Sequence, residues 1–395
     1  MIKDPAAVFL ILAAVVFVSI KLEEKVPLFR ALGAALTGIL LGMLLSNTGI
    51  LPGESPTYNF LMGDGVYFGI ALILLNVDLR SVLKAGPGML GAFGIGAAGT
   101  ALGAMVGGLF LSGMVGPETW KLAGQYAGTY TGGGANFAAV GRAFETSPDL
   151  FAAATAADVI ITAVWMATCL AVPVLLGRPK QEHTADGVRP AASTDGGKTE
   201  GLPEASGPRP ATLEKSLNSS VRPIPMSDLA ALVAVALGAV WASEAFGGLF
   251  PAIPEVLWLT SIVLVLAQIP AINALPGGAL FGNYLILLFL ASNGARSVVA
   301  TLVAIGPAVF YFALVTVAVH GLVIFGVGRL FKLDLPTLAV ASQANVGGAA
   351  SAIANAGARG YTDRLVPGVA VGLLGYAVGN YLGLAVGLLM RGILT

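Results

Sequence analysis

Long apolar segments fill most of this chain of 395 residues and restrict the folds that it can adopt. A helix that crosses the hydrocarbon core of a bilayer needs about 20 mostly apolar residues. Charged residues make up only 11% of the chain, against about 25% in soluble proteins, which is too few to cover a soluble domain this long. The sequence therefore predicts an all-α, polytopic membrane protein. Its apolar segments are roughly 5–20, 28–50, 60–79, 88–114, 122–141, 149–176, 227–249, 254–272, 276–300, 303–328, 336–357 and 364–390.

One polar stretch separates these segments into two sets of six. Residues 178–226 contain no Phe, Tyr or Trp, seven prolines, and 13 of the chain's 42 charged residues (21 basic plus 21 acidic). Such a composition cannot bury enough apolar surface to offset the entropy lost on ordering. We expect a disordered, cytoplasmic linker at 178–226, between an N-terminal membrane repeat (1–177) and a C-terminal membrane repeat (227–395).

The two halves share four short motifs in the same order. Many secondary transporters are built from such internal repeats, often inverted, with the substrate site near the membrane midplane. The matched positions are Gly63-Asp64-Gly65 with Gly282-Asn283-Tyr284, Arg80-Ser81-Val82 with Arg296-Ser297-Val298, Gly86-Pro87 with Gly306-Pro307, and Gly132-Gly133-Gly134 with Gly347-Gly348-Ala349.

An inverted repeat needs an odd number of crossings in each half, so one segment of each six must fail to cross. The best candidates are 122–141 and 336–357, because Gly132–Gly134 and Gly347–Gly348 lie at their centres. Each glycine weakens a helix by about 1 kcal/mol relative to Ala, so adjacent glycines favour a break. We expect two inverted repeats, each with about five spanning helices and one broken or re-entrant helix.

The distribution of basic residues supports re-entrant fifth segments. With re-entrant segments and a cytoplasmic linker, nine Lys and Arg residues outside the linker fall inside and five fall outside. With twelve crossings, the two numbers are exchanged. The nine are Lys21, Lys25, Arg30, Arg80, Lys84, Arg329, Lys332, Arg359 and Arg364, and the five are Lys3, Lys121, Arg142, Arg296 and Arg391.

Three segments resemble a known family. GTYTGGGANFAAVG (128–141), ASQANVGGAASAIANAG (341–357) and GLLGYAVGNYLG (372–383) resemble the domain-of-unknown-function family 819, within the superfamily of cation/proton antiporters and anion transporters. The layout is also similar to that of sodium/glutamate and 2-hydroxycarboxylate transporters. This resemblance implies a secondary transporter with a substrate site between two inverted halves, and many such relatives are sodium-coupled elevator dimers. It does not imply a particular substrate.

Polar residues surround both glycine breaks and are candidates for an ion or solute site. At a break, backbone carbonyls lose their helical partners, and hydroxyl and amide oxygens suit a hard cation such as Na⁺. A half-helix that starts there offers free N–H groups to an anion. The alternative is close helix packing through small residues, with the polar groups as interhelical hydrogen bonds. The candidates are Thr129, Tyr130, Thr131, Gly132, Gly133 and Asn136 at the first break, and Ser342, Gln343, Asn345, Gly347, Gly348 and Ser351 at the second.

Four further polar residues lie in or near apolar segments. Asp158 is deep in its segment and is a candidate for binding H⁺ or Na⁺, the alternative being a carboxyl hydrogen-bonded to Thr155 or Thr162. Asn380 is a possible neutral counterpart. His320 is interpreted as a packing residue in preference to a proton relay. Arg296 is interpreted as a membrane-edge anchor in preference to a contact with an anionic substrate.

These features favour a secondary active transporter without enzymatic activity or cofactor, which uses Na⁺ or H⁺ to move a small polar or anionic organic solute by alternating access. Na⁺ is possible at Thr131, Asn136, Asn345 and Asp158. The scaffold would be 5–50 and 227–272, and the elevator-like core 60–176 and 276–390. The second hypothesis is a cation/proton antiporter without an organic substrate, and the third is an intramembrane enzyme or channel. We expect a homodimer in the plasma (inner) membrane, and the balanced charge gives no reason to expect nucleic-acid binding.

Overall fold

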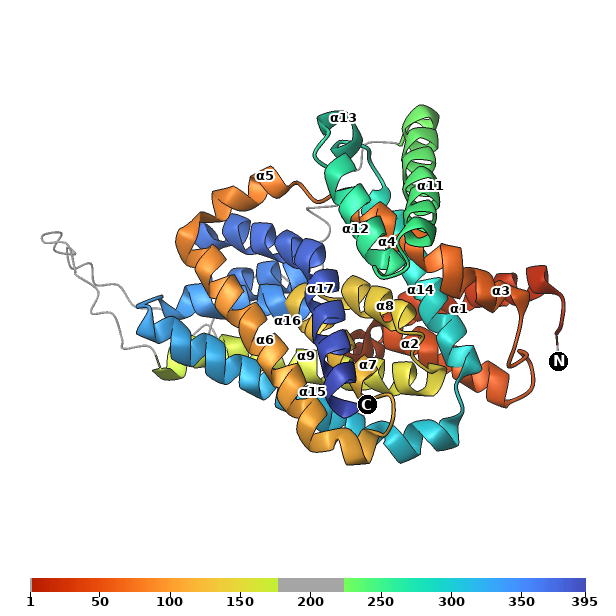
Figure 1. The fold of residues 1–395 in the computed structure, drawn as a ribbon, viewed down its shortest axis with the longest axis horizontal. Coiled ribbons are helices and arrows are strands. Elements are labelled where there is room, and N and C mark those ends of the chain that lie inside the picture. Colours follow the sequence, from red (N-terminus) through yellow and green to blue (C-terminus); the bar gives the residue numbers. More distant parts are fainter. Residues whose placement is uncertain (1, 177–223) are drawn as a thin grey trace, which may run out of the picture.

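The computed structural model describes residues 2–176 and 224–395, which form helices joined by short loops, with no strand among them (Figure 1). The segment 178–226 lies almost entirely outside the described residues, so its expected disorder stays a prediction. Within the described ranges, eight helices are long and apolar enough to cross a membrane, and two shorter apolar helices cover Leu32–Asn47 and Glu255–Leu266. The prediction of an all-α, polytopic membrane protein is therefore confirmed for this part of the chain.

Local sequence explains where several helices begin and end. The Asp4 carboxylate caps the first helix by accepting a hydrogen bond from the Ala7 N–H at 2.8 Å. The segment expected at 254–272 is helical only to Leu266, because Pro270 disfavours helical backbone at the residue before it and starts a new short helix. The helices are α1 (Pro5–Lys25), α2 (Pro27–Asn47), α3 (Pro56–Phe60), a π-helical turn (Leu61–Gly65), α4 (Val66–Leu74), α5 (Leu79–Val82), α6 (Gly86–Val115), α7 (Thr119–Gly132), α8 (Gly134–Ala143), α9 (Pro148–Leu176), α11 (Met226–Leu249), α12 (Glu255–Leu266), α13 (Pro270–Asn273), α14 (Gly278–Arg296), α15 (Val299–Leu330), α16 (Leu335–Ala358) and α17 (Leu365–Leu394).

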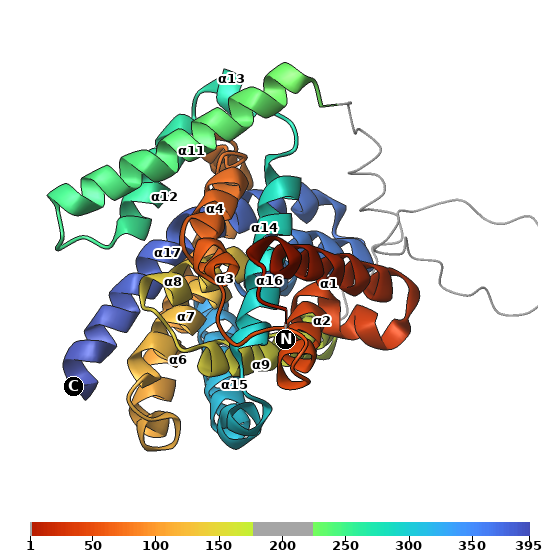
Figure 2. The ribbon, with the colours of Figure 1, turned by 90° about the vertical axis from the view of Figure 1, so that its right-hand side faces the viewer.

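The long helices pack as two bundles. In the first, α14 packs against α1, α2 and α4, and α4 packs in turn against α11 and α12; we call this the α14 bundle. In the second, α6 packs against α15, and α17 packs against α7 and α16, with α9 alongside α15 and α16; we call this the α17 bundle. Figures 1 and 2 show the two bundles side by side. Each bundle combines helices from both halves of the sequence, so neither half is a separate folding unit.

Glycines allow the helices to approach closely where they cross. A Cβ atom on Gly103 of α6 would collide with the Thr316 carbonyl of α15, and one on Gly99 would lie 2.9 Å from the Val323 side chain. In the α14 bundle, a Cβ on Gly69 of α4 would lie 3.1 Å from the carbonyl oxygen of Gly282 in α14. In lipid, the hydrophobic effect does not drive helices together. Small residues at the crossings let the backbones approach closely, and the resulting dispersion contacts stabilise helix association instead.

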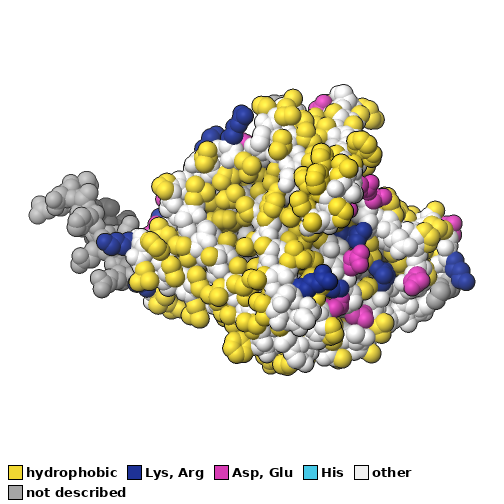
Figure 3. Space-filling model, viewed as in Figure 1, with side chains coloured by type: hydrophobic (Ala, Val, Ile, Leu, Met, Phe, Trp, Pro, Cys, Tyr) yellow, Lys and Arg dark blue, Asp and Glu magenta, His cyan; other side chains and the backbone are white. Residues whose placement is uncertain are grey.

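The molecule has two polar ends, and hydrogen bonds show which loops and helix ends lie together at each. At one end, which we call the Arg391 side, Asn47 donates to the Ser297 carbonyl and Lys121 to the Glu145 carbonyl. At the other end, the Arg364 side, Gln268 donates to the Val77 carbonyl. On the face drawn in Figure 3, hydrophobic side chains cover most of the centre and left, and charged side chains gather to the right of the centre, with a few at the upper, left and right edges. A broad band without charge is what the hydrocarbon core of a bilayer requires.

Candidate functional site

The first glycine break is the tip of a helical hairpin. At Gly133 the backbone has φ 88° and ψ −176°, a region that is essentially open only to glycine, and it separates α7 from α8. The two arms run back along each other, since Thr146 after α8 donates to the Gln125 side chain in α7 at 3.0 Å. Lys121 near the start of α7 reaches the Glu145 carbonyl after α8. The segment therefore enters and leaves on the Arg391 side and is re-entrant.

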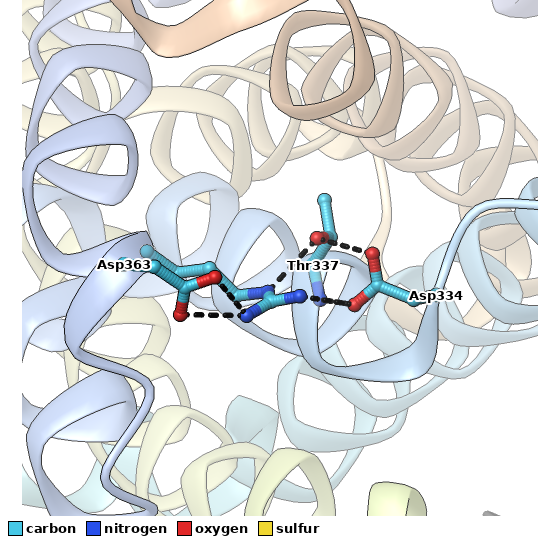
Figure 4. Close-up of polar contacts among 4 residues, drawn as sticks. Asp334, Thr337 and Asp363 are labelled. Atoms are coloured by element: carbon cyan, nitrogen blue, oxygen red, sulfur yellow. Dashed lines mark hydrogen bonds and ion pairs between the residues drawn. The ribbon is translucent and has the colours of Figure 1, made fainter.

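The second break, in α16, has the same backbone geometry and the same consequence. Gly348 has φ 73° and ψ −168°. Arg364, which follows the end of α16, bonds back to its beginning: its guanidinium donates to Asp334 at 3.0 Å and to the Thr337 hydroxyl at 3.1 Å (Figure 4). Both ends of α16 therefore lie on the Arg364 side, and this segment is also a re-entrant hairpin. The breaks expected at both glycine clusters are present in the structure.

The two hairpins meet tip to tip in the middle of the molecule. A Cβ on Gly133 would lie 3.9 Å from the Cα of Gly348, and 3.6 Å from the ring of Tyr376. Helix α17 passes both tips: its Gly372 contacts Ala349 behind the second tip, and its Gly375 contacts Gly132 at the first. The hairpins thus approach each other from opposite ends of α17.

A cavity of about 860 Å³ reaches from these tips toward the Arg364 side. It lies between the two bundles: Asn283 and Leu290 of α14 form one wall, and Asp158 and Thr162 of α9 form part of the other. Arg30, an exposed residue near the start of α2, lies at its rim. A pocket of this size and position is typical of a small-molecule site. Among the predicted residues, those that line it are Thr129, Gly133, Asp158, Gly347 and Ser351.

Asp158 is the acidic group nearest the hairpin tips in this cavity wall. Its carboxylate accepts a hydrogen bond from the Thr162 hydroxyl at 3.4 Å, as one of the sequence alternatives expected. The hydroxyl of Tyr130 faces it but has no hydrogen bond of standard geometry. The carboxylate is therefore only weakly hydrogen-bonded by protein and is accessible from the cavity.

Several buried polar atoms near the tips have no hydrogen-bond partner among the described residues. Such an atom costs about 1–3 kcal/mol if nothing satisfies it. The positions on both sides of the tips therefore have hydrogen-bonding capacity for water, an ion or a solute. The atoms are Thr129 Oγ1, Tyr130 Oη, Thr131 Oγ1, Gln343 Oε1, Gln343 Nε2 and Asn345 Oδ1.

Other predicted residues hold helices together instead of lining the cavity. The amide of Asn136 lies against the α17 backbone, where its oxygen, in the orientation that satisfies it, accepts from the N–H groups of Gly379 (3.2 Å) and Asn380 (3.0 Å). Asn380 donates to the Thr260 hydroxyl of α12 at 2.9 Å, and Asn345 donates to the Phe93 carbonyl of α6 at 3.2 Å. Of the four residues considered for Na⁺, Asp158 lines the cavity, and no group of three or more His, Cys, Asp or Glu residues forms a metal site in the described ranges.

His320 and Ser342 belong to one buried network. Ser342 Oγ lies 2.8 Å from His320 Nε2 and accepts from the Trp165 indole N–H at 2.8 Å. Because His320 Nδ1 lies 2.9 Å from the Gly96 carbonyl, which can only accept, Nδ1 carries the proton and Nε2 accepts from Ser342. The ring is therefore fully hydrogen-bonded, in agreement with the interpretation of His320 as a packing residue.

Sequence reasoning did not identify some residues that shape the site. Tyr376 contacts both hairpin tips, and Asn76 lines the cavity from the end of α4. Both lie within or at the end of apolar segments, where a single tyrosine or asparagine gives no strong signal. The motif GLLGYAVGNYLG (372–383) contains Tyr376 and marked this region, but it did not single the residue out.

Comparison with known proteins identifies the family. The family described as "Protein of unknown function (DUF819)" matches residues 7–393. The chain is similar to "Uncharacterized membrane protein YjcL" from Bacillus subtilis (strain 168), with 29% identity over 383 residues, covering 94% of this chain and 93% of that protein. The chain is a multi-pass membrane protein and belongs to the DUF819 family.

Proposed function

We propose that the protein is a secondary active transporter that couples Na⁺ or H⁺ to the movement of a small polar or anionic organic solute. The observation that carries this proposal is the meeting of two re-entrant hairpin tips, Gly133 and Gly348, at the blind end of a cavity that opens on one side. Non-helical backbone at membrane depth is tolerated where it is buried in protein or lines a water-filled cavity. Transporter sites are often built from discontinuous helices of this kind.

The packing supports movement of one bundle against the other. The cavity lies between the α14 bundle and the α17 bundle, and both hairpins belong to the α17 bundle. We therefore propose an elevator-like motion in which α6–α9 and α15–α17 carry the site. Helices α4 and α14 pack with α1, α2, α11 and α12, so we assign them to the static part, although they fall within 60–176 and 276–390.

The distribution of basic residues between the two polar ends supports one orientation in the membrane. The nine basic residues that the re-entrant topology assigns to the inside lie in the loops and helix ends of the Arg364 side, where α9 ends and α11 begins. By the preference for basic residues on the cytoplasmic face, we place this side, and the segment 178–226, in the cytoplasm of the plasma (inner) membrane. The cavity then faces inward. The inverted relation of the halves and a homodimer are parts of the same proposal.

Flux in proteoliposomes tests the proposal. Purified protein is reconstituted and uptake of labelled small acids and amino acids is measured with Na⁺ or pH gradients. We expect gradient-dependent uptake of at least one solute, and a loss of about tenfold or more in Asp158→Asn, because hydrogen bonds to a charged group contribute about 1.5–3 kcal/mol. The matched control is Thr168→Val on the same helix, whose exposed hydroxyl bonds only the Val164 carbonyl. No gradient-dependent uptake of any solute would contradict the proposal.

A cation/proton antiporter is the second candidate, and one observation favours it. Asp158 is the acid that lines the cavity near the hairpin tips, and a single carboxylate that exchanges H⁺ for Na⁺ needs no organic substrate. The two functions separate in vesicles loaded with a pH-sensitive dye. An antiporter dissipates an imposed pH gradient when Na⁺ alone is added, whereas an H⁺–solute symporter changes the gradient only when the solute is also present, and a Na⁺–solute symporter leaves it unchanged.

A further inference from the structure

A second, smaller cavity lies on the Arg391 side, opposite the opening of the central cavity. Its volume is about 190 Å³, room for about six water molecules. Helix α8 and the loop after it form one wall, with Arg142 and Thr146, and the end of α14 forms the other, with Asn293 and Arg296. Like the central cavity, it lies between the α17 bundle and the α14 bundle.

Three phenyl rings separate the two cavities. Phe137 of α8 packs edge-on against Phe151 of α9 with ring centroids 4.7 Å apart, and Phe151 packs against Phe289 of α14 at 5.3 Å. Helices α8, α9 and α14 each line both cavities, on opposite sides of these rings. The small cavity is therefore positioned on the same route through the molecule as the central one, beyond a hydrophobic barrier.

Two guanidinium groups line the small cavity with no carboxylate at ion-pair distance, although the Glu255 carboxylate interacts with Arg142 at longer range. Neither Arg142 nor Arg296 forms an ion pair with a described residue. The Arg142 guanidinium lies 5.6 Å from the centre of the Tyr67 ring, with its Nε buried and without a hydrogen-bond partner, and Arg296 contacts the sulfur of Met62. The acid in the lining, Glu145, is exposed to solvent. The lining therefore has a net positive charge at this depth.

A buried acceptor lies in the same wall. Asn293 is only 1% exposed; its Nδ2 donates to the Phe289 carbonyl at 3.2 Å, and its Oδ1 has no partner among the described residues. The nearby hydroxyls are already used, because Ser147 donates to Glu118 at 2.5 Å and Thr146 donates to Gln125. The groups in this cavity that remain available to hydrogen-bond a ligand are thus two guanidiniums as donors and one amide oxygen as acceptor.

We propose that this cavity is a second binding site, for a small carboxylate that carries a hydroxyl or ammonium donor on the adjacent carbon. The carboxylate lies between Arg142 and Arg296, whose planar guanidiniums match its geometry, and the adjacent donor bonds Asn293 Oδ1. The site is the capture site of the opposite face, closed from the central cavity by Phe137, Phe151 and Phe289. This inference rests on the proposed function, because it gives the anionic solute a binding site on the face where the central cavity is shut.

Arginine footprinting tests the site without requiring transport. The purified full chain is treated with phenylglyoxal, and the modification rate of each arginine is measured by mass spectrometry. Four probes of similar size are compared: glycolate, glycine, acetate without the adjacent donor, and glycolamide without the charge. We expect glycolate or glycine to slow modification of Arg142 and Arg296 at lower concentrations than acetate, with no effect of glycolamide. Arg391, on the same side but outside the cavity, should react at an unchanged rate.

Two variants assign the contacts. In Asn293→Ala, we expect the advantage of glycolate over acetate, about tenfold for a hydrogen bond to a buried acceptor, to disappear while acetate protection of Arg296 remains. In Arg296→Gln, the concentration of glycolate that protects Arg142 should rise about tenfold or more, whereas Arg391→Gln should not change it. Failure of every carboxylate to protect, or equal protection by glycolamide, would overturn the site.

The arginine footprint and the flux assay can refute the second site and the transport proposal separately. Protection of Arg142 and Arg296 in a protein that moves no solute in proteoliposomes would support the site and contradict the transport proposal. Solute flux without protection by any carboxylate would support transport and overturn the site.

Discussion

The three consecutive glycines at the first hairpin tip give three different predictions for the same substitution. Each is replaced by alanine, the smallest change that adds a Cβ. At Gly132, the new Cβ would collide with the carbonyl group of Gly375 in α17. Two backbones cannot separate locally without moving the hairpin, so we expect destabilisation at or above the top of the overpacking range, about 3 kcal/mol.

At the next two positions the physical reason changes. Gly133 has φ 88° and ψ −176°, and its Cβ would have only ordinary contacts, the nearest at 3.6 Å. The cost there is backbone strain of about 1–3 kcal/mol. Gly134 begins α8 with helical backbone, and no atom lies within 4 Å of its Cβ position. Alanine at Gly134 should be neutral or stabilise the protein by up to about 1 kcal/mol, because alanine is the better helix former.

The assay is the apparent unfolding temperature of the purified protein in detergent, for wild type and the three variants under identical heating. By the average unfolding entropy per residue, a difference of 1 kcal/mol corresponds to about 1 °C in a chain of this length. We expect the order Gly134→Ala at or above wild type, then Gly133→Ala, then Gly132→Ala lowest or absent from the folded fraction. If Gly134→Ala lowers the temperature as much as Gly132→Ala, the close contact with α17 is wrong. If Gly133→Ala behaves like Gly134→Ala, the chain does not turn at Gly133.

Two further predictions concern polar contacts on and near the second hairpin. Burial opposes ionisation of Asp334, but hydrogen bonds and the Arg364 charge outweigh it and lower the pKa of this carboxyl. Its stabilising contribution should therefore be complete above about pH 4 and decline as the pH falls further. The unfolding temperatures of wild type and Asp334→Asn should then converge at low pH, and a constant difference between them would contradict the contact. Ser342→Ala leaves the Trp165 N–H without its acceptor and His320 Nε2 without its donor. The loss should destabilise the protein by about 1–3 kcal/mol for each group left without a partner. The control is Ser112→Ala, at an exposed hydroxyl of α6, which should unfold within about 1 °C of wild type.

The sequence predicts the membrane class and the positions of the breaks because both depend on local composition. Adjacent glycines at 132–134 and 347–348 mark the places where helical backbone is weakest, and the structure breaks at Gly133 and Gly348. Whether a broken segment crosses or returns depends on contacts between its two arms, such as that of Thr146 with Gln125. Those contacts involve residues about 20 positions apart and leave no periodic pattern in the sequence.

The candidate site was harder to predict, because residue type does not show which way a side chain points. Asn136, Asn345 and Asn380 are polar residues in apolar segments, as Asp158 is, yet all three form amide hydrogen bonds to neighbouring helices, while Asp158 lines the cavity. Arg142 gave no signal beyond its charge, because the cavity that it lines is assembled from separate helices. Polar residues in an apolar segment therefore indicate burial against protein, but not the identity of the partner.

Helix α17 packs closely against both hairpins. Its glycines form a row in which Gly372 contacts the α16 hairpin behind its tip, and Gly375 and Gly383 contact α7. From the first to the last of these positions is about 16 Å along the axis, at 1.5 Å per residue. A slip or rotation of α17 would shift all these contacts together, so neither hairpin can change register with this helix alone. A displacement of this one helix would therefore alter contacts with the hairpin that enters from each face of the membrane.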